Sequence, residues 1–329
     1  MALPAIADLR RERPGATIVV AARRAVAPLF SLVPDVNDTI VLDHRTSHRL
    51  SAWRQARADL RAGGFGAAFI LPNSFQAAFL AARAGIPERW GYRTDWRGWL
   101  LTRALDPPAG LHQAAYYQRL AAALGFASGP LTPSVDVPVE LRAAGAHRLM
   151  AAGWDGRAPV VALAPGAAYG GAKRWPPKAF AEVAFSLAAQ GVATTLVGTA
   201  ADAPTGLEIE AALAGRSPIV NLIGRTDLRA LAGVLANCRA IVSNDSGAMH
   251  LAAAIGVLVT ALFGPTNELA TGPLPRSARP EWDLRDAPVV IVTHPVSCRP
   301  CMLRECPIDH PCMREISVER VVSATLRSS

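Results

Sequence analysis

The segment that most constrains the fold runs from Ala240 to Thr266 and reads AIVSNDSGAMHLAAAIGVLVTALFGPT. Two short apolar runs in it, 240–243 and 257–263, have the length and the β-branched content of buried parallel strands. An Ala-rich stretch of helical character lies between these two runs. A strand, a loop, a helix and a second strand in this order predict an α/β domain with a parallel sheet.

The loop of this unit, Asn244-Asp245-Ser246-Gly247, is small and polar and stands where the helix begins. Backbone N–H groups and the positive end of the helix dipole attract anions at such a position, so the loop can bind a phosphate. Asp245 or Ser246 could equally be an ordinary N-cap, which is the plainer interpretation of the loop alone. However, His250 falls in the first turn beside them, and a capped helix does not need it.

The same alternation of strands and helices extends over the whole chain and predicts a doubly wound α/β fold. A chain of 329 residues is expected to form two domains. A Gly- and Pro-rich run at 125–138 resembles a linker, and we place the domains at 1–150 and 151–329. In such sheets, ligands bind at the carboxyl ends of the strands.

The charge and the hydropathy of the chain exclude several classes of protein. The basic residues that give the net charge of +8 are scattered, which indicates solvated surface and no nucleic-acid partner. No apolar run reaches the roughly 18 residues that a membrane span requires, and the N-terminus lacks the pattern of a signal peptide. We therefore expect a cytoplasmic protein, whose charge permits peripheral contact with the inner membrane near phosphorylated acceptors.

A second candidate anion site follows the apolar run 160–163. The loop after it, 164–176, is rich in small residues and Gly and reaches Lys173 and Arg174, so that backbone amides and a cation can approach a pyrophosphate. Asp202 follows the next predicted strand, 194–197, where an acid can accept hydrogen bonds from ribose hydroxyls. A lone Asp in that place also suits a turn or a cap.

In the first half, a predicted strand at 67–71 enters Pro72-Asn73-Ser74. The segment 89–103, RWGYRTDWRGWLLTR, then combines three Trp with several Arg. Aromatic rings stack on sugar faces and guanidinium groups grip phosphates, so this segment could clamp a sugar or a phosphate. The alternative is a surface loop whose aromatic side chains only cover the domain.

Four cysteines, Cys298, Cys301, Cys306 and Cys312, crowd near the end of the chain, with His310 among them. Such a group could bind zinc or an iron–sulfur cluster. The spacing is more compact than that of the usual paired zinc knuckles, and thiols in the cytosol are kept reduced. We therefore prefer reduced thiols in a Pro-rich crossover and predict no metal.

Three motifs, PGAAYGGAKRWP at 165–176, SNDSGAMHLAAAIG at 243–256 and LFGPT at 262–266, resemble glycosyltransferase family 9. The stretch LPNSFQAAFLAARAGIPERWGYR at 71–93 is similar to the acceptor half of that family, and CRPCMLRECPIDHPCM at 298–313 looks like the tail of many members. The resemblance covers essentially the whole chain, and the motifs occur in the family's order.

This resemblance implies a GT-B fold, in which two Rossmann-like domains face a cleft. It implies inverting transfer of L-glycero-D-manno-heptose from ADP-heptose to the first heptose of a lipid A–Kdo–heptose acceptor, without a metal or another cofactor. Lys173 would grip the diphosphate, Ser246 and Gly247 would offer amides to phosphate, Asp245 and His250 would face sugar or phosphate, Asp202 would bind ribose, and Asn73, Ser74 and Arg93 would bind the acceptor.

The chain departs from the family at its start. Family members begin with a strand and a Gly-Asp loop that carries the proposed base, whereas Met1-Ala2-Leu3-Pro4 resembles the segment that comes after that loop. One explanation is that the start is wrongly assigned and that about 15 to 25 residues, the length of one strand and its loop, are missing. The other is a short chain that binds the nucleotide sugar without transferring it. A stop codon directly before Met1 would exclude the first explanation. The chain of 329 residues is expected to be poorly active and less stable, because its first sheet would lack the central strand.

Two other enzyme classes would each need further residues. A GT-B epimerase of UDP-sugars would share the fold but would need acid and base side chains in the cleft, and titration with ADP and UDP separates the two. An NAD-dependent oxidoreductase would need a G-x-G-x-x-G turn after a first strand.

Overall fold

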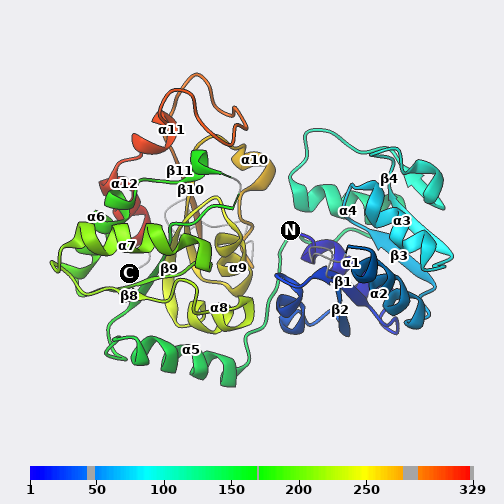
Figure 1. Ribbon diagram of the computed structural model, residues 1–329, viewed down its shortest axis with the longest axis horizontal. Coiled ribbons are helices and arrows are strands. Elements are labelled where there is room, and N and C mark those ends of the chain that lie inside the picture. Colours follow the sequence, from blue (N-terminus) through cyan, green and yellow to red (C-terminus); the bar gives the residue numbers. More distant parts are fainter. Residues whose placement is uncertain (43–48, 169, 277–287, 327–329) are drawn as a thin grey trace. The chain divides into compact units, whose positions relative to one another are not determined.

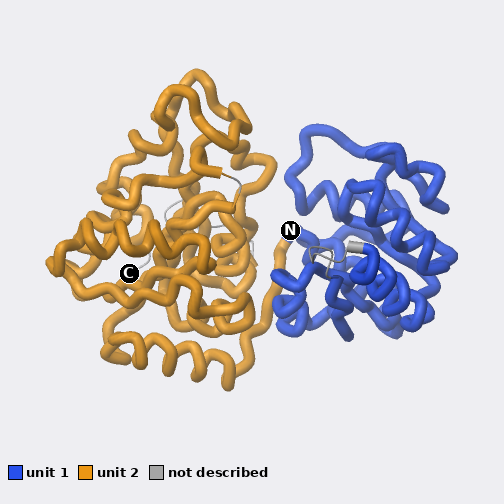
Figure 2. Tube along the Cα trace, in the orientation of Figure 1, with its two compact units in different colours: residues 1–131 blue, residues 132–329 orange. Residues whose placement is uncertain are grey.

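The computed structural model describes residues 1–42, 49–168, 170–276 and 288–326. They form two compact units, unit 1 with residues 1–131 and unit 2 with residues 132–329 (Figure 2). The division lies earlier than the predicted change near residue 150. The reason is helix α5 (Val139–Ala151), which packs against α8 (Leu228–Leu235) and so belongs to unit 2 (Figure 1).

Unit 2 is built on one parallel sheet with the strand order β11-β10-β9-β6-β7-β8. Its strands are β6 (Val160–Ala164), β7 (Ala193–Leu196), β8 (Val220–Asn221), β9 (Cys238–Asn244), β10 (Leu258–Phe263) and β11 (Val289–Thr293). β6 pairs with both β7 and β9, so the chain reverses its direction across the sheet between β6 and β9. The predicted parallel α/β fold is confirmed, and its topological switch point lies at the carboxyl ends of these two strands.

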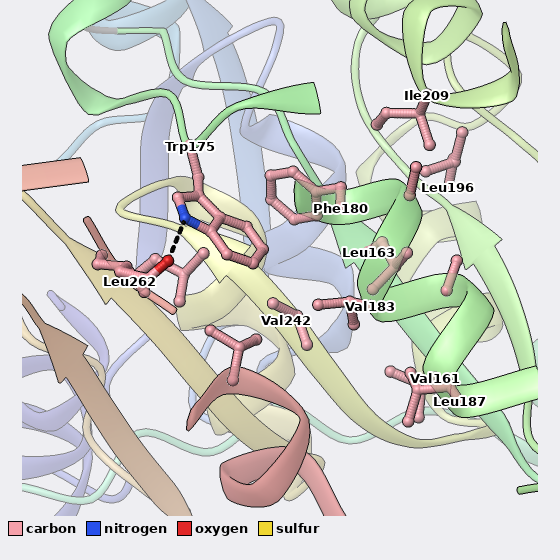
Figure 3. Packing of buried hydrophobic residues seen from close by; sticks show 14 of the residues in the cluster. Val161, Leu163, Trp175, Phe180, Val183, Leu187, Leu196, Ile209, Val242 and Leu262 are labelled. Carbon is pink, nitrogen blue, oxygen red and sulfur yellow. Dashed lines mark hydrogen bonds between the residues drawn. The ribbon is translucent and has the colours of Figure 1, made fainter. Parts of the chain in front are cut away.

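The helices of unit 2 cover this sheet (Figure 1). They are α5, η3 (Gly171–Lys173), α6 (Pro177–Ala188), η4 (Ala200–Asp202), α7 (Ala203–Leu213), α8, α9 (Gly247–Ile255), α10 (Glu268–Thr271), α11 (Pro311–Arg314) and α12 (Val318–Leu326). Trp175, Phe180 and Leu163 are fully buried in the main core cluster (Figure 3). Large aromatic and aliphatic side chains from loop, helix and strand thus fix the layers to one another.

Helices α5 and α8 approach each other at two glycines, which explains why no apolar stripe marks α5 in the sequence. A Cβ atom on Gly145 would lie 2.1 Å from the carbonyl oxygen of Gly233, and one on Gly233 would lie 2.4 Å from that of Leu141. The two helices therefore touch through their backbones at these glycines. A side chain at either position would fit only if the helices moved apart.

Gly145→Ala is expected to lower the free energy of unfolding by about 2 kcal/mol or more, because the added methyl group overpacks this contact. Urea denaturation measures the change. Gly15→Ala is the matched control, since a Cβ there meets no atom within 4 Å, and its effect should stay within about 0.5 kcal/mol. Equal effects of the two substitutions would contradict the close helix contact.

Unit 1 contains two parallel sheets, β1 (Val19–Arg23) with β2 (Asp38–Leu42), and β3 (Ala67–Ile70), β4 (Glu88–Tyr92) and β5 (Arg103–Leu105) in that order. Within the described ranges, β1 pairs with β2 alone and β3 with β4 alone. The expectation that the first sheet lacks a central strand stays a prediction. The segment 89–103 is more than a loop, because it begins in β4 and ends in β5.

The helices of unit 1 are α1 (Leu3–Glu12), η1 (Ala27–Leu32), α2 (Arg49–Ala62), α3 (Phe75–Arg83), η2 (Gly98–Leu100) and α4 (Gln113–Ala123). Of these, η1 and η2 are short 3₁₀ helices. None of the helices in the described residues has the length and apolarity that a membrane span needs.

Candidate functional site

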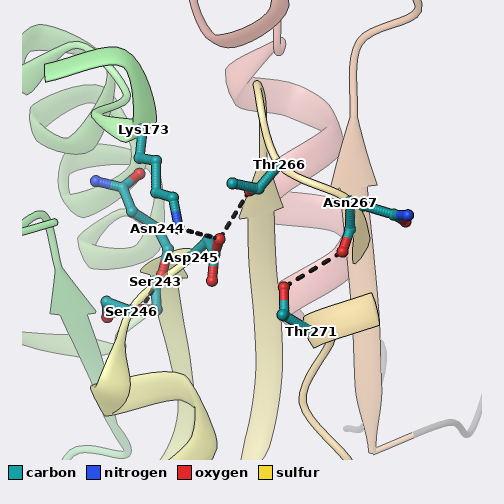
Figure 4. A network of polar contacts seen from close by, with 8 residues as sticks. All are labelled: Lys173, Ser243, Asn244, Asp245, Ser246, Thr266, Asn267 and Thr271. Atoms are coloured by element: carbon teal, nitrogen blue, oxygen red, sulfur yellow. Dashed lines mark hydrogen bonds and ion pairs between the residues drawn. The ribbon is translucent and has the colours of Figure 1, made fainter. Parts of the chain in front are cut away.

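Three loops at the carboxyl edge of the sheet in unit 2 bring a cation and a carboxylate together. Lys173, after β6, places its Nζ 2.5 Å from Oδ2 of Asp245, which follows β9. Thr266, after β10, donates its hydroxyl to the same oxygen at 2.7 Å (Figure 4). The side chains of Lys173 and Asp245 are only 12% and 8% exposed. A largely buried ion pair is thus held at the switch point, where α/β folds bind ligands.

Asn244 ties the two central loops of this site together. Its fully buried side chain donates to the carbonyl oxygen of Pro165 at 2.7 Å and accepts the backbone N–H of Trp175 at 3.2 Å. Trp175 in turn donates its indole N–H to the carbonyl oxygen of Ile316 and packs edge-on against Phe180 (Figure 3). Because these polar groups of Asn244 and Trp175 have partners, the loop that carries Lys173 is fixed in place.

The start of α9 differs from an ordinary capped helix. Ser246 stands at the N-cap position but makes no side-chain cap, and its hydroxyl lies 3.0 Å from that of Ser243. The carboxylate of Asp245 is engaged by Lys173 and Thr266. The cap that the sequence allowed is therefore not formed by either side chain. Gly247 begins the helix two residues after Asp245, the partner of Lys173, which is an arrangement suited to an anion.

His250 lies one turn into α9 and is half-buried. Tyr169, in the loop before Lys173, lies outside the described residues. The donor-site residues predicted from separate motifs thus lie on two neighbouring loops and one helix of unit 2. They are Lys173, Asp245, Ser246, Gly247 and His250.

Asp202 serves as a cap at the carboxyl end of β7. One carboxylate oxygen accepts the backbone N–H and the hydroxyl of Thr199, at 2.9 and 2.8 Å, and the other lies 3.8 Å from Arg174. A Cβ on Gly166 would lie 2.5 Å from this carboxylate, so the glycine permits its close approach to the β6 loop. The structure gives Asp202 the capping role that the sequence left open, and its contact with ribose stays a prediction.

The predicted acceptor residues gather at the carboxyl ends of β3 and β4 in unit 1. Asn73 donates to the hydroxyl of Tyr116 at 2.9 Å, and Ser74 caps α3 by accepting the backbone N–H of Ala77. The hydroxyl of Thr94 donates to the carbonyl oxygen of Asn73 at 2.9 Å. This hydrogen bond joins the loop after β4 to the loop after β3. Arg93 is more than half exposed and lies 3.6 Å from Asp106.

Several residues of these sites were not singled out from the sequence. Asn244 and Thr266 lie inside motifs that were recognised, whereas Tyr116 on α4 carries no signal of its own. Tyr92 donates to the carbonyl oxygen of Tyr116 at 2.8 Å, and burial raises the pKa of Tyr92 to about 12.

The cysteines of the tail are unpaired. The free thiols are those of Cys298, Cys301, Cys306 and Cys312 in the tail and that of Cys238 in β9. Burial raises the pKa of Cys312, and the other three cysteines of the tail raise it further. Within the described residues, no three His, Cys, Asp or Glu side chains are arranged to hold a metal ion. The preference for reduced thiols without metal stays a prediction.

Comparison with known proteins gives a consistent match. The model of the family described as glycosyltransferase family 9 (heptosyltransferase) matches residues 53–302. Lipopolysaccharide heptosyltransferase 2 of Salmonella typhimurium is 35% identical over 284 residues, which cover 82% of this chain and 80% of that protein. The same enzyme of Escherichia coli is 34% identical with equal coverage.

The solved structures agree with the sequence comparison. The structure of E. coli ADP-heptose LPS heptosyltransferase II superposes with a TM-score of 0.81 at 30% identity, and covers 98% of this chain and 92% of that one. A family 9 glycosyltransferase from Veillonella parvula reaches a TM-score of 0.77 at 21% identity, over 88% and 81% of the two chains, which shows the fold alone. The two α/β units have the GT-B fold, and the chain belongs to glycosyltransferase family 9.

Proposed function

We propose that this chain transfers L-glycero-D-manno-heptose from ADP-heptose to the first heptose of the lipopolysaccharide inner core, with inversion at the anomeric carbon. The observation that carries the proposal is the buried Lys173–Asp245 pair at the uncapped start of α9. The heptosyltransferase 2 relatives, more than 30% identical over four-fifths of their length, support the same reaction.

The site suits the departure of ADP. When the bond between the anomeric carbon and the phosphate oxygen breaks, the electron pair and the negative charge remain on the diphosphate. Lys173 and the amides at Gly247 would stabilise that charge, because preorganised donors in a largely buried site need little reorganisation. Asp245, fixed by Thr266, acts as a positioning residue that directs the lysine.

The acceptor is proposed to bind unit 1 at Asn73, Ser74 and Arg93. Asn73 and Ser74 offer an amide and a hydroxyl for sugar hydroxyls, and the exposed guanidinium of Arg93 suits a phosphate or carboxylate of the inner core. Since lipid A anchors this acceptor, we place the enzyme at the cytoplasmic face of the inner membrane.

Incubation of the purified chain with ADP-heptose and a heptose-bearing lipid A–Kdo acceptor tests the reaction. We expect release of ADP together with a product whose mass has grown by one heptose. UDP should not replace ADP in donor titrations. Tight binding of ADP-heptose without product would contradict the transfer and favour a nucleotide-sugar-binding protein.

His250→Ala is expected to weaken the affinity for ADP-heptose about tenfold, because a contact to the sugar or phosphate at the start of α9 is lost. Isothermal titration calorimetry measures the affinity. The control is His147→Ala, an exposed histidine on α5 of the same unit, whose affinity should equal that of the wild type. If the His250 variant binds as well as this control, His250 does not belong to the donor site.

A further inference from the structure

The charge of the protein is concentrated in unit 1. Residues 1–131 contain sixteen arginines and nine acidic residues, a net charge of +7, whereas unit 2 carries the remaining +1 of the total of +8. The basic residues of unit 1 include no lysine. This asymmetry indicates that an anionic partner meets unit 1, and arginine is the cation that binds phosphate groups with two parallel hydrogen bonds.

A row of four aromatic side chains crosses the surface of the same unit. Trp53 of α2 stacks on Phe79 of α3 at 5.9 Å between ring centroids, and Phe79 stacks on Phe75 at 5.7 Å. Phe75 contacts Trp99 of η2 at 6.2 Å. We call these four residues the aromatic strip. Trp53, Phe79 and Phe75 are half-buried and pack against the core of unit 1, but Trp99 is 73% exposed.

Trp96 lies in the loop that leads to Trp99, and its side chain is 93% exposed. Asp95 and Trp96 both have left-handed backbone conformations, with φ of 47° and 55°. A bulky residue rarely adopts this conformation, because the side chain crowds the backbone. Such strain persists only where neighbouring contacts impose it, and it often marks a functional segment.

The contacts that impose this conformation come from several directions. The carboxylate of Asp95 accepts the backbone N–H of Phe75 at 2.5 Å, at the first residue of α3. Arg97, fully buried, donates to the carbonyl oxygens of Tyr92, Pro72 and Ser74. The loop is therefore fixed from within, and a large indole is held outward in water, where a large apolar side chain gains nothing from the fold itself.

We propose that Trp96 and the aromatic strip dock unit 1 on the headgroup layer of an anionic phospholipid bilayer. Indole rings favour the membrane interface, because they combine a large apolar body with one N–H donor. Arg54, exposed beside Trp53, and the net charge of unit 1 complement anionic headgroups. The contact that we propose is peripheral.

The position of the strip agrees with a lipid-anchored acceptor. The loop that holds Trp96 is bonded through Thr94 to Asn73 and through Arg97 to Ser74, the two residues to which the acceptor is assigned. The acceptor's place beside this loop rests on the proposed function, whereas the docking itself does not. An enzyme seated on the bilayer here would receive a sugar that emerges from the headgroup layer beside its own acceptor loop.

Vesicle flotation with the full chain tests the docking. We expect the wild type to float with vesicles of phosphatidylethanolamine and phosphatidylglycerol, and much less with vesicles of phosphatidylcholine. Trp96→Ala with Trp99→Ala should weaken binding to the anionic vesicles about tenfold or more. The matched control is Leu207→Ala with Leu269→Ala, which removes two apolar side chains of unit 2 that are 64% and 81% exposed. The control should bind like the wild type.

A second variant and a second assay keep the result decisive. Trp96→Ala alone removes an almost fully exposed side chain, so its thermal unfolding should match the wild type while vesicle binding still falls. Vesicle binding equal to that of the wild type in both tryptophan variants would overturn the proposal. The proposal would also be overturned if the tryptophan variants lost as much transfer to a delipidated, water-soluble acceptor as to the lipid-anchored one. The indoles would then contact the acceptor sugar. Vesicle binding by a wild type that transfers no heptose would support the docking and refute the proposed function.

Discussion

Lys173→Ala is expected to lower kcat/KM for heptose transfer about a thousandfold, the size of effect seen when one preorganised donor to a developing negative charge is removed. The substitution deletes the cation that lies 2.5 Å from Asp245 and leaves that buried carboxylate with Thr266. The site would then face the leaving diphosphate with a negative charge in place of a neutralised pair. Steady-state rates of ADP release measure the loss.

Lys178→Ala provides a close control, because Lys173 and Lys178 are the two lysines of the chain. Lys178 is exposed on α6, and its removal changes the net charge by the same amount. We expect its kcat/KM to remain at the level of the wild type, and thermal unfolding should verify that both variants are folded. If Lys173→Ala keeps a rate within a few-fold of this control, the lysine does not stabilise the leaving group.

Trp175→Ala is expected to have the largest effect on stability, about 3 to 5 kcal/mol. The side chain is fully buried against Phe180, and its indole N–H donates to the carbonyl oxygen of Ile316. The substitution removes this packing and leaves a buried acceptor without its donor. For a unit of this size the loss corresponds to a fall in Tm of about 10 °C, which differential scanning calorimetry measures.

Two further variants separate the contributions of Trp175. Trp175→Phe keeps most of the ring packing but loses the N–H, so it should lose less stability than the alanine variant. Trp154→Ala removes a half-buried tryptophan elsewhere in unit 2 and should cost clearly less. A fall in Tm no larger for Trp175→Ala than for Trp154→Ala would show that the core does not depend on Trp175.

Four strands of the unit 2 sheet were predicted from the sequence, whereas β8 and β11 were not. The strands expected at 160–163, 194–197, 240–243 and 257–263 are β6, β7, β9 and β10, because buried parallel strands appear as short apolar runs. Helix α5 was not predicted, since only Gly145 and Leu149 of this helix are buried and its contact with α8 is centred on glycines. In unit 1, β4 was hidden in a segment whose arginines and tryptophans resemble a loop.

The sequence by itself determined the parallel α/β fold, the family and the two loops that hold the candidate donor site, because apolar periodicity and short motifs are local properties of the chain. Only the tertiary structure decided which of these residues contact one another. Lys173 and Asp245 are 72 positions apart, and their contact depends on β6 and β9 being neighbours in the sheet. Tertiary structure also decided the role of Asp202, whose carboxylate accepts hydrogen bonds from Thr199. It likewise decided the exposure of Trp96, whose loop is held by the buried contacts of Arg97. Strand order and loop geometry set such contacts, and neither can be read from spacing along the chain.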